Sequence, residues 1–559
     1  MILASIRKWK YLLLTNISLL CIGSPSFAAE KINIIYGSLN LDLQVESLEK
    51  FADEGVVNQE LEFYFKNAGL KPEQQEALRQ TLSKQFTIDG VQLSAFLNTP
   101  TGEILLERMG NLISGQGGRN GKYLLRGALV QAALDKEEGL TLINFLKYLA
   151  TDVELNVGDI QQMLDYQKRL SLATDSLTKD ALNLVDQSIT NSDRDYSKIP
   201  DLREQGKYGV RPPQILQLHD RTRDRKFDVH IYQPQTWRSG GKTPVVVVSH
   251  GLGSQPEDFK ALGEQLASYG FFVAIPQHIG SDNKQIEAMM DGYSDELYDL
   301  QDFINRPLDI SYVLDELETR NQSEFDDRLD LEKVGVLGHS FGGYTALAVA
   351  GATWDFDNIR TYCDRRVWEA NISMLLQCQT LDLPEREYSF RDARVKAIGV
   401  MNPVNSVVFG SQGLSKVEIP VIIGAGTNDP ATPPIIEQIR TFAWVTSEDK
   451  YLFVMEGQAH FLSNPDPNSQ INNLVNLLVN FQGIDKNLFT VYGNTQATAF
   501  LQNYLMEDEN YQIYLEPAYW QYISEESFPI YWLDREAVNT LTETYNSFKP
   551  AEIPTLYAN

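Results

Sequence analysis

The chain has 559 residues, which is too long for one ordinary domain, so we expect two or three folded units. Its apolar fraction of 43% is typical of a folded, soluble protein. The 48 basic and 75 acidic side chains leave a formal net charge of -27, which argues against nucleic acid or anionic lipid headgroups as main partners. A solvated acidic surface is the simpler interpretation of this charge.

Residues 1–28 have the layout of a signal peptide. An apolar run at 11–22 lies between a positive end and the small-residue cleavage site Ser26-Phe27-Ala28. The positive end consists of Arg7, Lys8 and Lys10. The apolar run is short for a membrane span. We therefore expect an exported protein, periplasmic or extracellular, whose mature chain starts near Ala29 and does not insert stably in the membrane; an uncleaved anchor is the alternative.

Two cysteines remain after such a cleavage, Cys363 and Cys378. In an oxidising compartment, an even pair this close in sequence favours one disulfide that closes a short loop. Two free buried thiols are the alternative.

Residues 30–200 predict a helical N-terminal domain. Val45, Leu48 and Phe51 recur on one helical face before Gly55, a plausible C-cap. Pro72 stands where a further helix would begin. The predicted helices after it are 102–113, 123–134, 140–149 and 157–170. We expect an all-α domain without chemistry of its own, because it contains no cysteine or histidine.

Residues 188–213 are rich in polar, Pro and Gly residues and favour a linker. From there the pattern alternates apolar β-branched runs with helical stretches, which predicts a mostly parallel sheet flanked by helices. The predicted strands are 214–218, 226–232, 245–249, 271–275, 334–337, 396–401, 421–425 and 451–455. We expect an α/β catalytic domain over 205–530, with a cap-like excursion at 352–394, and a C-terminal tail at 531–559.

The candidate nucleophile is Ser340, in Gly338-His339-Ser340-Phe341-Gly342. A predicted strand precedes this stretch and a predicted helix follows it, which is the context of a nucleophile elbow. The glycines matter because the serine backbone is strained and its neighbours must not carry clashing side chains.

A nucleophilic serine needs a base and an acid that orients the base. His460 follows the strand 451–455, where the order Ser, Asp/Glu, His places the base. Asp429 follows the strand 421–425 and is the candidate acid, with an ordinary turn aspartate as the alternative. The other strand end offers only Asn402, which carries no charge.

The tetrahedral intermediate requires two backbone donors. One is the amide of Phe341, directly after the nucleophile. For the second we choose the amide of Leu252, because glycines flank it in the turn Ser249-His250-Gly251-Leu252-Gly253. A simple glycine turn is the competing interpretation.

These motifs carry family resemblances. The turn at 249–253 together with 338–343 resembles the platelet-activating-factor acetylhydrolase group of α/β-hydrolases. The segments around Asp429 and His460 resemble bacterial polyester hydrolases and cutinase-like esterases, and 304–309 is similar to a run in dienelactone-hydrolase-like proteins. The whole layout resembles a cyanobacterial family of exported hydrolases of unassigned substrate. The resemblance implies an α/β-hydrolase fold.

Two departures affect the substrate rather than the reaction class. The acetylhydrolases take their acid from the earlier strand end, where this chain has Asn402. The excursion at 352–394 is apolar enough to contact a lipid or other hydrophobic ester, although a plain packing role explains it equally well.

We therefore expect an exported serine ester hydrolase that works through an acyl-enzyme, with Ser340, His460 and Asp429 as its triad. The partner is a small-molecule or lipid ester, and no metal or organic cofactor is implied. A peptidase or amidase on the same triad, and a non-catalytic binding protein on a hydrolase fold, are the alternatives.

Overall fold

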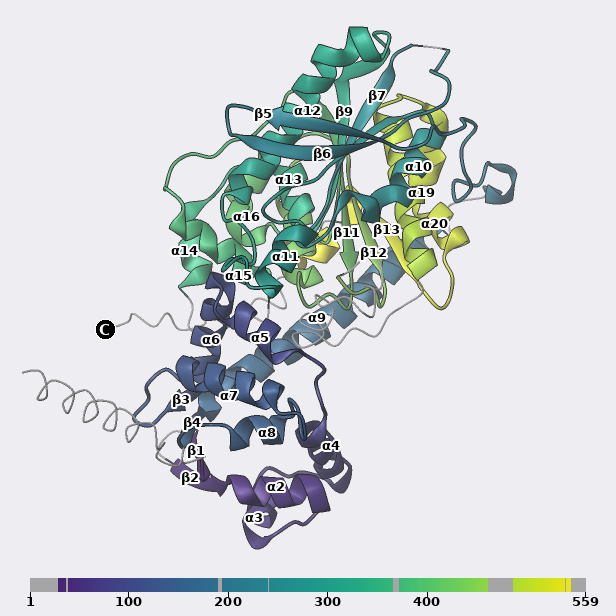
Figure 1. The fold of residues 1–559 in the computed structure, drawn as a ribbon. Helices are drawn as coiled ribbons and strands as arrows, with labels where there is room; N and C mark the ends of the chain where they lie inside the picture. The colour runs from purple at the N-terminus through teal and green to yellow at the C-terminus, as the bar shows by residue number, and fades with distance from the viewer. Residues whose placement is uncertain are drawn as a thin grey trace, which may run out of the picture. The chain divides into compact units, whose positions relative to one another are not determined.

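The computed structural model describes residues 29–36, 39–189, 194–239, 241–364, 371–460, 486–537 and 539–543 (Figure 1). The predicted signal segment at 1–28 lies outside these ranges. The chain forms two compact units. The N-terminal unit contains residues up to 94 together with 106–160, and the C-terminal unit contains 95–105 and the chain from 161 onward.

The unit boundary differs from the predicted linker at 188–213. One helix, α9 (Val157–Ile189), begins in the N-terminal unit and continues into the C-terminal unit. Beyond it, Tyr196 and Leu202 are buried in the core of the C-terminal unit. The segment 188–213 is polar in composition but contains two core residues, which were not predicted from the sequence. The C-terminal unit therefore begins well before residue 205.

The N-terminal unit is mainly helical, and its helices begin and end as local signals predict. Gly55 closes the first of them with a left-handed φ of 72°, and Pro72 occupies the first turn of another. The helices within this unit are α2 (Val45–Glu54), α3 (Gln59–Asn67), α4 (Pro72–Ser83), α7 (Lys122–Leu134) and α8 (Leu142–Lys147). Two further helices, α5 (Gly90–Leu97) and α6 (Pro100–Leu112), are divided between the units, because residues 95–105 belong to the C-terminal unit.

The all-α description of this domain is wrong, because the unit also contains a four-stranded sheet in the order β2-β1-β4-β3. Its strands are β1 (Lys31–Tyr36), β2 (Leu39–Gln44), β3 (Ile113–Gly115) and β4 (Val153–Asn156). The run at 39–44 alternates leucine with a polar residue, which is a strand pattern. This strand was not predicted, because it is short and the segments around it have a longer helical periodicity.

The C-terminal unit is built on a nine-stranded sheet in the order β13-β12-β11-β10-β9-β7-β8-β6-β5. The strands from β12 to β8 in this order pair in parallel, and the outer strands pair antiparallel. The strands are β5 (Gln214–Asp220), β6 (Arg225–Tyr232), β7 (Thr243–Ser249), β8 (Phe272–Pro276), β9 (Leu329–His339), β10 (Val395–Met401), β11 (Val421–Gly426), β12 (Lys450–Met455) and β13 (Ile530–Leu533). The predicted α/β fold class is confirmed.

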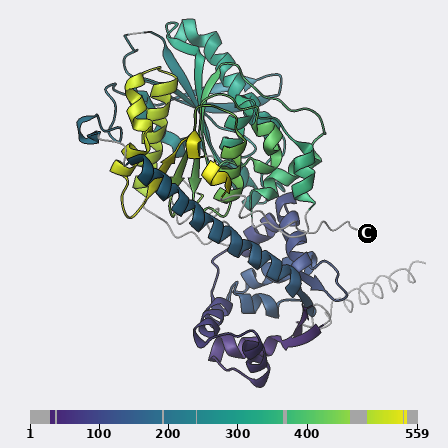
Figure 2. The same ribbon diagram turned by 180° about the vertical axis from the view of Figure 1, so that it is seen from behind.

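Helices flank this sheet as the alternating pattern predicts (Figures 1 and 2). The helices are α10 (Lys260–Ser268), α11 (Asn283–Met290), α12 (Asp302–Glu324), α13 (Phe341–Ala350), α14 (Phe356–Cys363), α15 (Met374–Gln377), α16 (Ser406–Leu414), α17 (Arg440–Trp444), α19 (Lys486–Tyr504) and α20 (Pro517–Ile523). The short 3₁₀ helices are η1 (Tyr196–Lys198), η2 (Pro256–Phe259), η3 (Cys378–Asp382), η5 (Glu509–Leu515) and η6 (Arg535–Ala537), and η4 (Ile435–Ile439) is a short π-helix. In Figure 1, α12 with α13 and α10 with α19 lie on opposite sides of the central strands.

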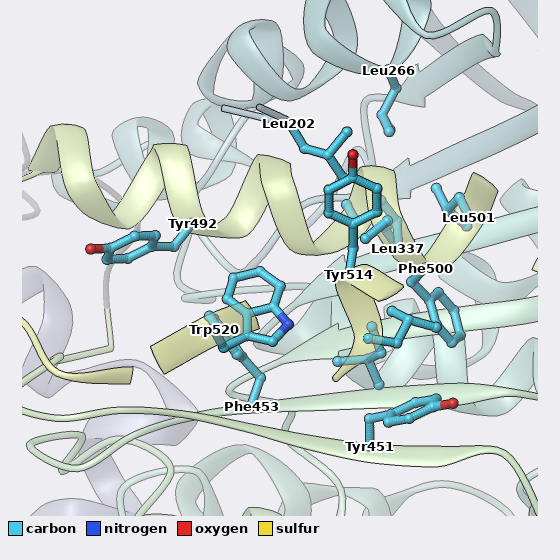
Figure 3. Close-up of a cluster of buried hydrophobic side chains, with 14 of the residues drawn as sticks. Leu202, Leu266, Leu337, Tyr451, Phe453, Tyr492, Phe500, Leu501, Tyr514 and Trp520 are labelled. Atoms are coloured by element: carbon cyan, nitrogen blue, oxygen red, sulfur yellow. The ribbon is translucent and has the colours of Figure 1, made fainter. Parts of the chain in front are cut away.

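A large apolar core lies where the C-terminal helices pack on the sheet (Figure 3). Trp520 of α20 stacks on Trp532 of β13, with ring centroids 5.2 Å apart. Both indoles are fully buried. The predicted boundary between residues 530 and 531 is therefore wrong: it cuts through β13, and the catalytic sheet extends to Leu533. Residues 544–559 of the predicted tail lie outside the described residues.

The described parts of the excursion, 352–364 and 371–394, are packed into the C-terminal unit. Met374, Leu375 and Leu376 are buried, and the Trp354 indole donates to the Tyr344 hydroxyl at 2.9 Å. The structure joins Cys363 and Cys378 in a disulfide. These contacts favour the packing interpretation of the apolar residues in the excursion.

Candidate active site

Ser340 lies in a strained turn between β9 and α13. Its φ of 55° and ψ of -117° are unusual for a residue with a side chain. A Cβ added to Gly342 would lie 1.9 Å from the Ser249 carbonyl oxygen, and one added to Gly338 would lie 2.1 Å from the Gly342 oxygen. The two glycines therefore let the backbone pass close enough to project the serine at the carboxyl edge of the sheet.

Neighbouring backbone fixes this turn. The Ser340 amide donates to the Met401 carbonyl at 2.9 Å, and its carbonyl accepts from the Val404 amide at 3.1 Å. The strained conformation is thus held from the adjacent strand β10.

The structure brings Ser340, His460 and Asp429 into one hydrogen-bonded chain. His460 Nε2 lies 2.8 Å from Ser340 Oγ, and His460 Nδ1 lies 2.8 Å from Asp429 Oδ2. All three residues are buried. This is the arrangement in which an imidazole can take the serine proton while a carboxylate orients the ring.

Asp429 is held as a carboxylate by its donors. The amides of Ala431 and Thr432 donate to Oδ1 at 2.8 and 2.9 Å, and the Thr432 hydroxyl donates to Oδ2 at 2.6 Å. Burial alone would raise the pKa of Asp429, but the charge of His460 and hydrogen bonds from His460 and Thr432 outweigh it and lower the pKa. The group is therefore ionised near neutral pH.

Asn402 acts here as a donor to Asp429. Its side-chain amide donates to Asp429 Oδ2 at 2.6 Å. From the sequence, Asn402 was considered only as an alternative to Asp429 for the acid, and it was rejected because its side chain carries no charge. The signal for its actual position was that β10 and β11 pair in parallel, which brings their carboxyl ends side by side.

His339 supports the loop that carries His460, a role that the sequence did not indicate. Its Nε2 donates to the His460 carbonyl at 2.7 Å. Burial, followed by the nearby charge of His460, lowers the pKa of His339 to about 3, so its imidazole is neutral near pH 7. A neutral ring with hydrogen on Nε2 fits the donor role.

The two predicted oxyanion donors flank the serine. The Phe341 amide belongs to the first turn of α13, where amides have no intrahelical acceptor. The turn carrying Leu252 is adjacent, since a Cβ on Gly251 would lie 3.3 Å from Ser340 Cβ. Within the described part of the chain, no hydrogen-bond acceptor is recorded for either amide. Both amides are thus available to a developing oxyanion.

The described residues lack two further kinds of feature. They contain no group of three or more His, Cys, Asp or Glu side chains arranged to hold a metal ion. Among the same residues, every helix is too short or too polar to cross a membrane.

Two family models match the chain. Residues 28–156 match the model described as "Alpha/beta hydrolase of unknown function (DUF1400)", and residues 199–360 match the chlorophyllase model. The chain therefore has an α/β-hydrolase fold. The first match falls mainly on the N-terminal unit. The second includes Ser340 and the turn at 249–253, and it ends before Asp429 and His460.

The chain is also similar to two mammalian enzymes. It is 30% identical to the platelet-activating factor acetylhydrolase of Canis lupus familiaris over 156 residues, which cover 21% of this chain and 35% of the relative. It is 26% identical to the enzyme of the same name from Bos taurus over 159 residues, which cover 20% and 34%. The chain spans about a third of the length of these relatives. The expected resemblance to the acetylhydrolase group is confirmed.

Proposed function

We propose that this α/β-hydrolase is a serine hydrolase that cleaves carboxylic esters through an acyl-enzyme. The observation that carries the proposal is the continuous chain from Ser340 Oγ through His460 to Asp429, with 2.8 Å at both links. The similarity to acetylhydrolases and the chlorophyllase match support ester hydrolysis in general.

Acylation follows from this geometry. His460 Nε2 accepts the hydroxyl proton as Ser340 Oγ bonds to the ester carbonyl carbon, and the carbonyl oxygen becomes an oxyanion. The amides of Leu252 and Phe341 donate to that oxyanion. When the tetrahedral intermediate collapses, the bond to the alcohol oxygen breaks and His460 returns the proton to the leaving alcohol.

Deacylation repeats the cycle with water. His460 accepts a proton from water as the water oxygen attacks the acyl carbon, and it then returns the proton to Ser340 Oγ while the carboxylic acid leaves. Asp429 keeps its charge throughout, because its role is to hold the ring and offset the imidazolium.

We also propose that the protein is exported, with residues 1–28 as its signal peptide. The Cys363–Cys378 disulfide supports this proposal, since such bonds persist mainly in oxidising compartments. Mass spectrometry of the protein made in its native host tests it. A mature N-terminus near Ala29 is expected, and an intact leader would contradict cleavage.

A substrate panel tests the catalytic proposal. p-Nitrophenyl esters of increasing acyl length and the matching anilides are offered to the folded protein, together with its Ser340→Ala variant. Turnover of the esters, lost in Ser340→Ala along with labelling by a fluorophosphonate probe, is expected. Turnover of anilides alone would favour a peptidase or amidase, and silence on both would favour a binding protein.

A further inference from the structure

A fully buried arginine lies beneath the turn that carries Leu252. Arg306 of α12 has no exposed surface. Its Nη1 donates to the His250 carbonyl at 2.6 Å, and its Nη2 donates to the Gly251 carbonyl at 3.3 Å. Its Nε donates to Ser281 Oγ at 2.8 Å. One guanidinium group thus holds two successive carbonyls of this turn.

The second of these carbonyls has a direct link to the oxyanion donor. Gly251 C=O and Leu252 N–H belong to one planar peptide group. A cation that donates to the carbonyl fixes the plane of this group and polarises it, so that the N–H becomes a stronger donor. Arg306 therefore acts on the Leu252 amide through the peptide bond.

His250 reinforces the same peptide group. Its Nε2 accepts from the His278 amide at 3.0 Å, so the ring hydrogen lies on Nδ1, which is 2.8 Å from the Gly251 carbonyl. Burial, with the charge of Arg306 next, lowers the pKa of His250 well below its usual value, so the ring is neutral. The Gly251 carbonyl thus receives a charged donor from Arg306 and a neutral one from His250, and the Ser254 amide is a third donor at 3.4 Å.

Arg306 also contacts the residue that carries the other oxyanion donor. Its guanidinium carbon lies 4.4 Å from the centroid of the Phe341 ring. Arg306 therefore contacts both parts of the predicted oxyanion hole: the turn that carries the Leu252 amide and the side chain of Phe341.

Acidic neighbours keep this buried cation charged. Burial is the largest influence and lowers the pKa of Arg306 to about 10, with Asp302 and Asp309 opposing it. Asp302 lies on the same helix, with its Oδ2 3.9 Å from Arg306 Nε, and it accepts from Ser281 Oγ. The Ser281 carbonyl in turn accepts from the Gly253 amide at 2.9 Å, which ties the end of the turn to this network.

We propose that Arg306 is a positioning residue for the oxyanion hole, which orients and polarises the peptide group between Gly251 and Leu252. The proposal rests on the esterase function proposed above. Arg306 touches no reacting atom, so its effect belongs to the stabilisation of the tetrahedral state and not to substrate binding.

The chain offers a matched control in Arg225. This arginine is buried in the same network, where it pairs with Asp309 at 3.0 Å and donates to the Ile279 carbonyl at 3.0 Å. No contact with the turn at 249–253 is recorded for Arg225 in the described residues. Arg225→Lys therefore reports the structural cost of weakening a buried guanidinium.

The experiment compares wild type, Arg306→Lys and Arg225→Lys, each shown to be folded by near-ultraviolet circular dichroism. Lysine keeps the charge but cannot bridge two carbonyls and a hydroxyl. We expect Arg306→Lys to lower kcat about 10- to 100-fold with little change in KM, somewhat less than removal of a direct oxyanion donor. Arg225→Lys should keep kcat within about threefold.

Affinity for a boronic acid that forms a tetrahedral adduct with the serine provides the second readout. In Arg306→Lys this affinity should fall by about the same factor as kcat/KM, and in Arg225→Lys it should not. If Arg306→Lys does not fold, Ser281→Ala replaces it, with an expected loss of about 3- to 10-fold in both quantities. Equal behaviour of the Arg306 or Ser281 variant and Arg225→Lys overturns the proposal, whereas a wild type inactive on esters overturns the proposed function instead.

Discussion

Asp429 is a buried carboxylate that stays ionised and accepts a hydrogen bond from the neighbouring imidazole of His460. Its two oxygens accept hydrogen bonds from backbone amides, a hydroxyl, the side chain of Asn402 and His460. A carboxylate with this many donors is both rigid and ionised. In the proposed mechanism it therefore fixes the tautomer of His460 and offsets the charge that forms when Ser340 attacks.

Asp429→Asn should lower kcat by roughly 10³- to 10⁴-fold near neutral pH, the scale of a triad acid replaced by its amide. Asn402→Ala is the comparison, because it removes one donor and leaves the charge. We expect a loss of about tenfold or less for it, in line with one hydrogen bond to a charged group. Steady-state kinetics on a p-nitrophenyl ester measures both, and a folded Asp429→Asn protein with most of its activity would place the acid elsewhere.

At the scale of residues, the sequence predicted the members of the triad but not their support. Ser340, Asp429 and His460 follow strands in a characteristic order and can be found by motif. Arg306 and His339 donate hydrogen bonds to backbone carbonyls. Every residue has a backbone carbonyl, so no sequence motif indicates which one a side chain will contact. Their roles follow only from distances in the folded chain.

Helix α19 contains a glycine that packing does not require. Gly493 lines a cavity of about 160 Å³ between the sheet, α10 and α19, and a Cβ there would meet no atom within 4 Å. Gly493→Ala should therefore stabilise the fold by about 0.5 to 1 kcal/mol, because alanine loses less backbone entropy in a helix. Chemical denaturation measures the change.

A buried strand glycine provides the matched control for that substitution. A Cβ on Gly335 of β9 would lie 2.8 Å from Leu505 Cδ1 and 2.9 Å from Leu501 Cδ2. Gly335→Ala should destabilise the protein through overpacking, typically by about 1 to 3 kcal/mol. Equal effects of the two substitutions would contradict the assigned packing.

The excursion at 352–394 should depend on its disulfide. Cys363 and Cys378 are 15 residues apart, and loop entropy gives such a closure roughly 3 kcal/mol of stability. Replacing both by serine should lower the free energy of unfolding by about that amount or less. Two reactive thiols in the unfolded, unreduced protein would show that the bond does not form.

At the scale of elements, long periodic segments were predictable and short ones were not. Of the parallel strands, β7, β8, β10, β11 and β12 are mainly β-branched or apolar, and their ends were predicted to within two residues. Strand β9 begins five residues before the predicted start, because charged residues interrupt its first half. The N-terminal sheet was missed because its strands lack a continuous buried apolar run: β2, β3 and β4 are mostly exposed or half-buried, whereas equally short β11 and β12 are fully buried. The edge strand β13 was not predicted because it has only four residues. Its place in the core becomes evident only in the folded chain, where Trp532 stacks on Trp520.

For the molecule as a whole, the division into units depends on burial rather than on composition. The Tyr514 hydroxyl donates to the Pro200 carbonyl, and Gln265 donates to the Leu202 carbonyl. A polar stretch of sequence therefore belongs to the C-terminal core. Leu202→Ala should cost about 2 to 5 kcal/mol in unfolding free energy, the range for a buried leucine, whereas a linker residue would cost almost nothing.

Buried histidines should make the whole C-terminal unit sensitive to acid. Burial lowers the pKa of His278 to about 4 and that of His339 to about 3, and it lowers the pKa of His250 as well. Between about pH 4 and 6.5 the unfolded chain binds protons at these rings that the folded protein does not bind. Stability therefore rises with pH across this window and is lost on acidification.

Asp302 has the opposite effect on stability and so reduces the pH dependence that the histidines cause. Burial raises the pKa of Asp302 to about 7, so in the same window the folded protein holds a proton that the unfolded chain has released. Three histidines against one carboxyl leave a net uptake of about two protons on unfolding, and we expect a loss of about 3 kcal/mol between pH 6.5 and 5. Urea unfolding at the two pH values measures it. His278→Gln should reduce the slope by about one proton. A stability independent of pH would contradict the neutral state of the buried rings.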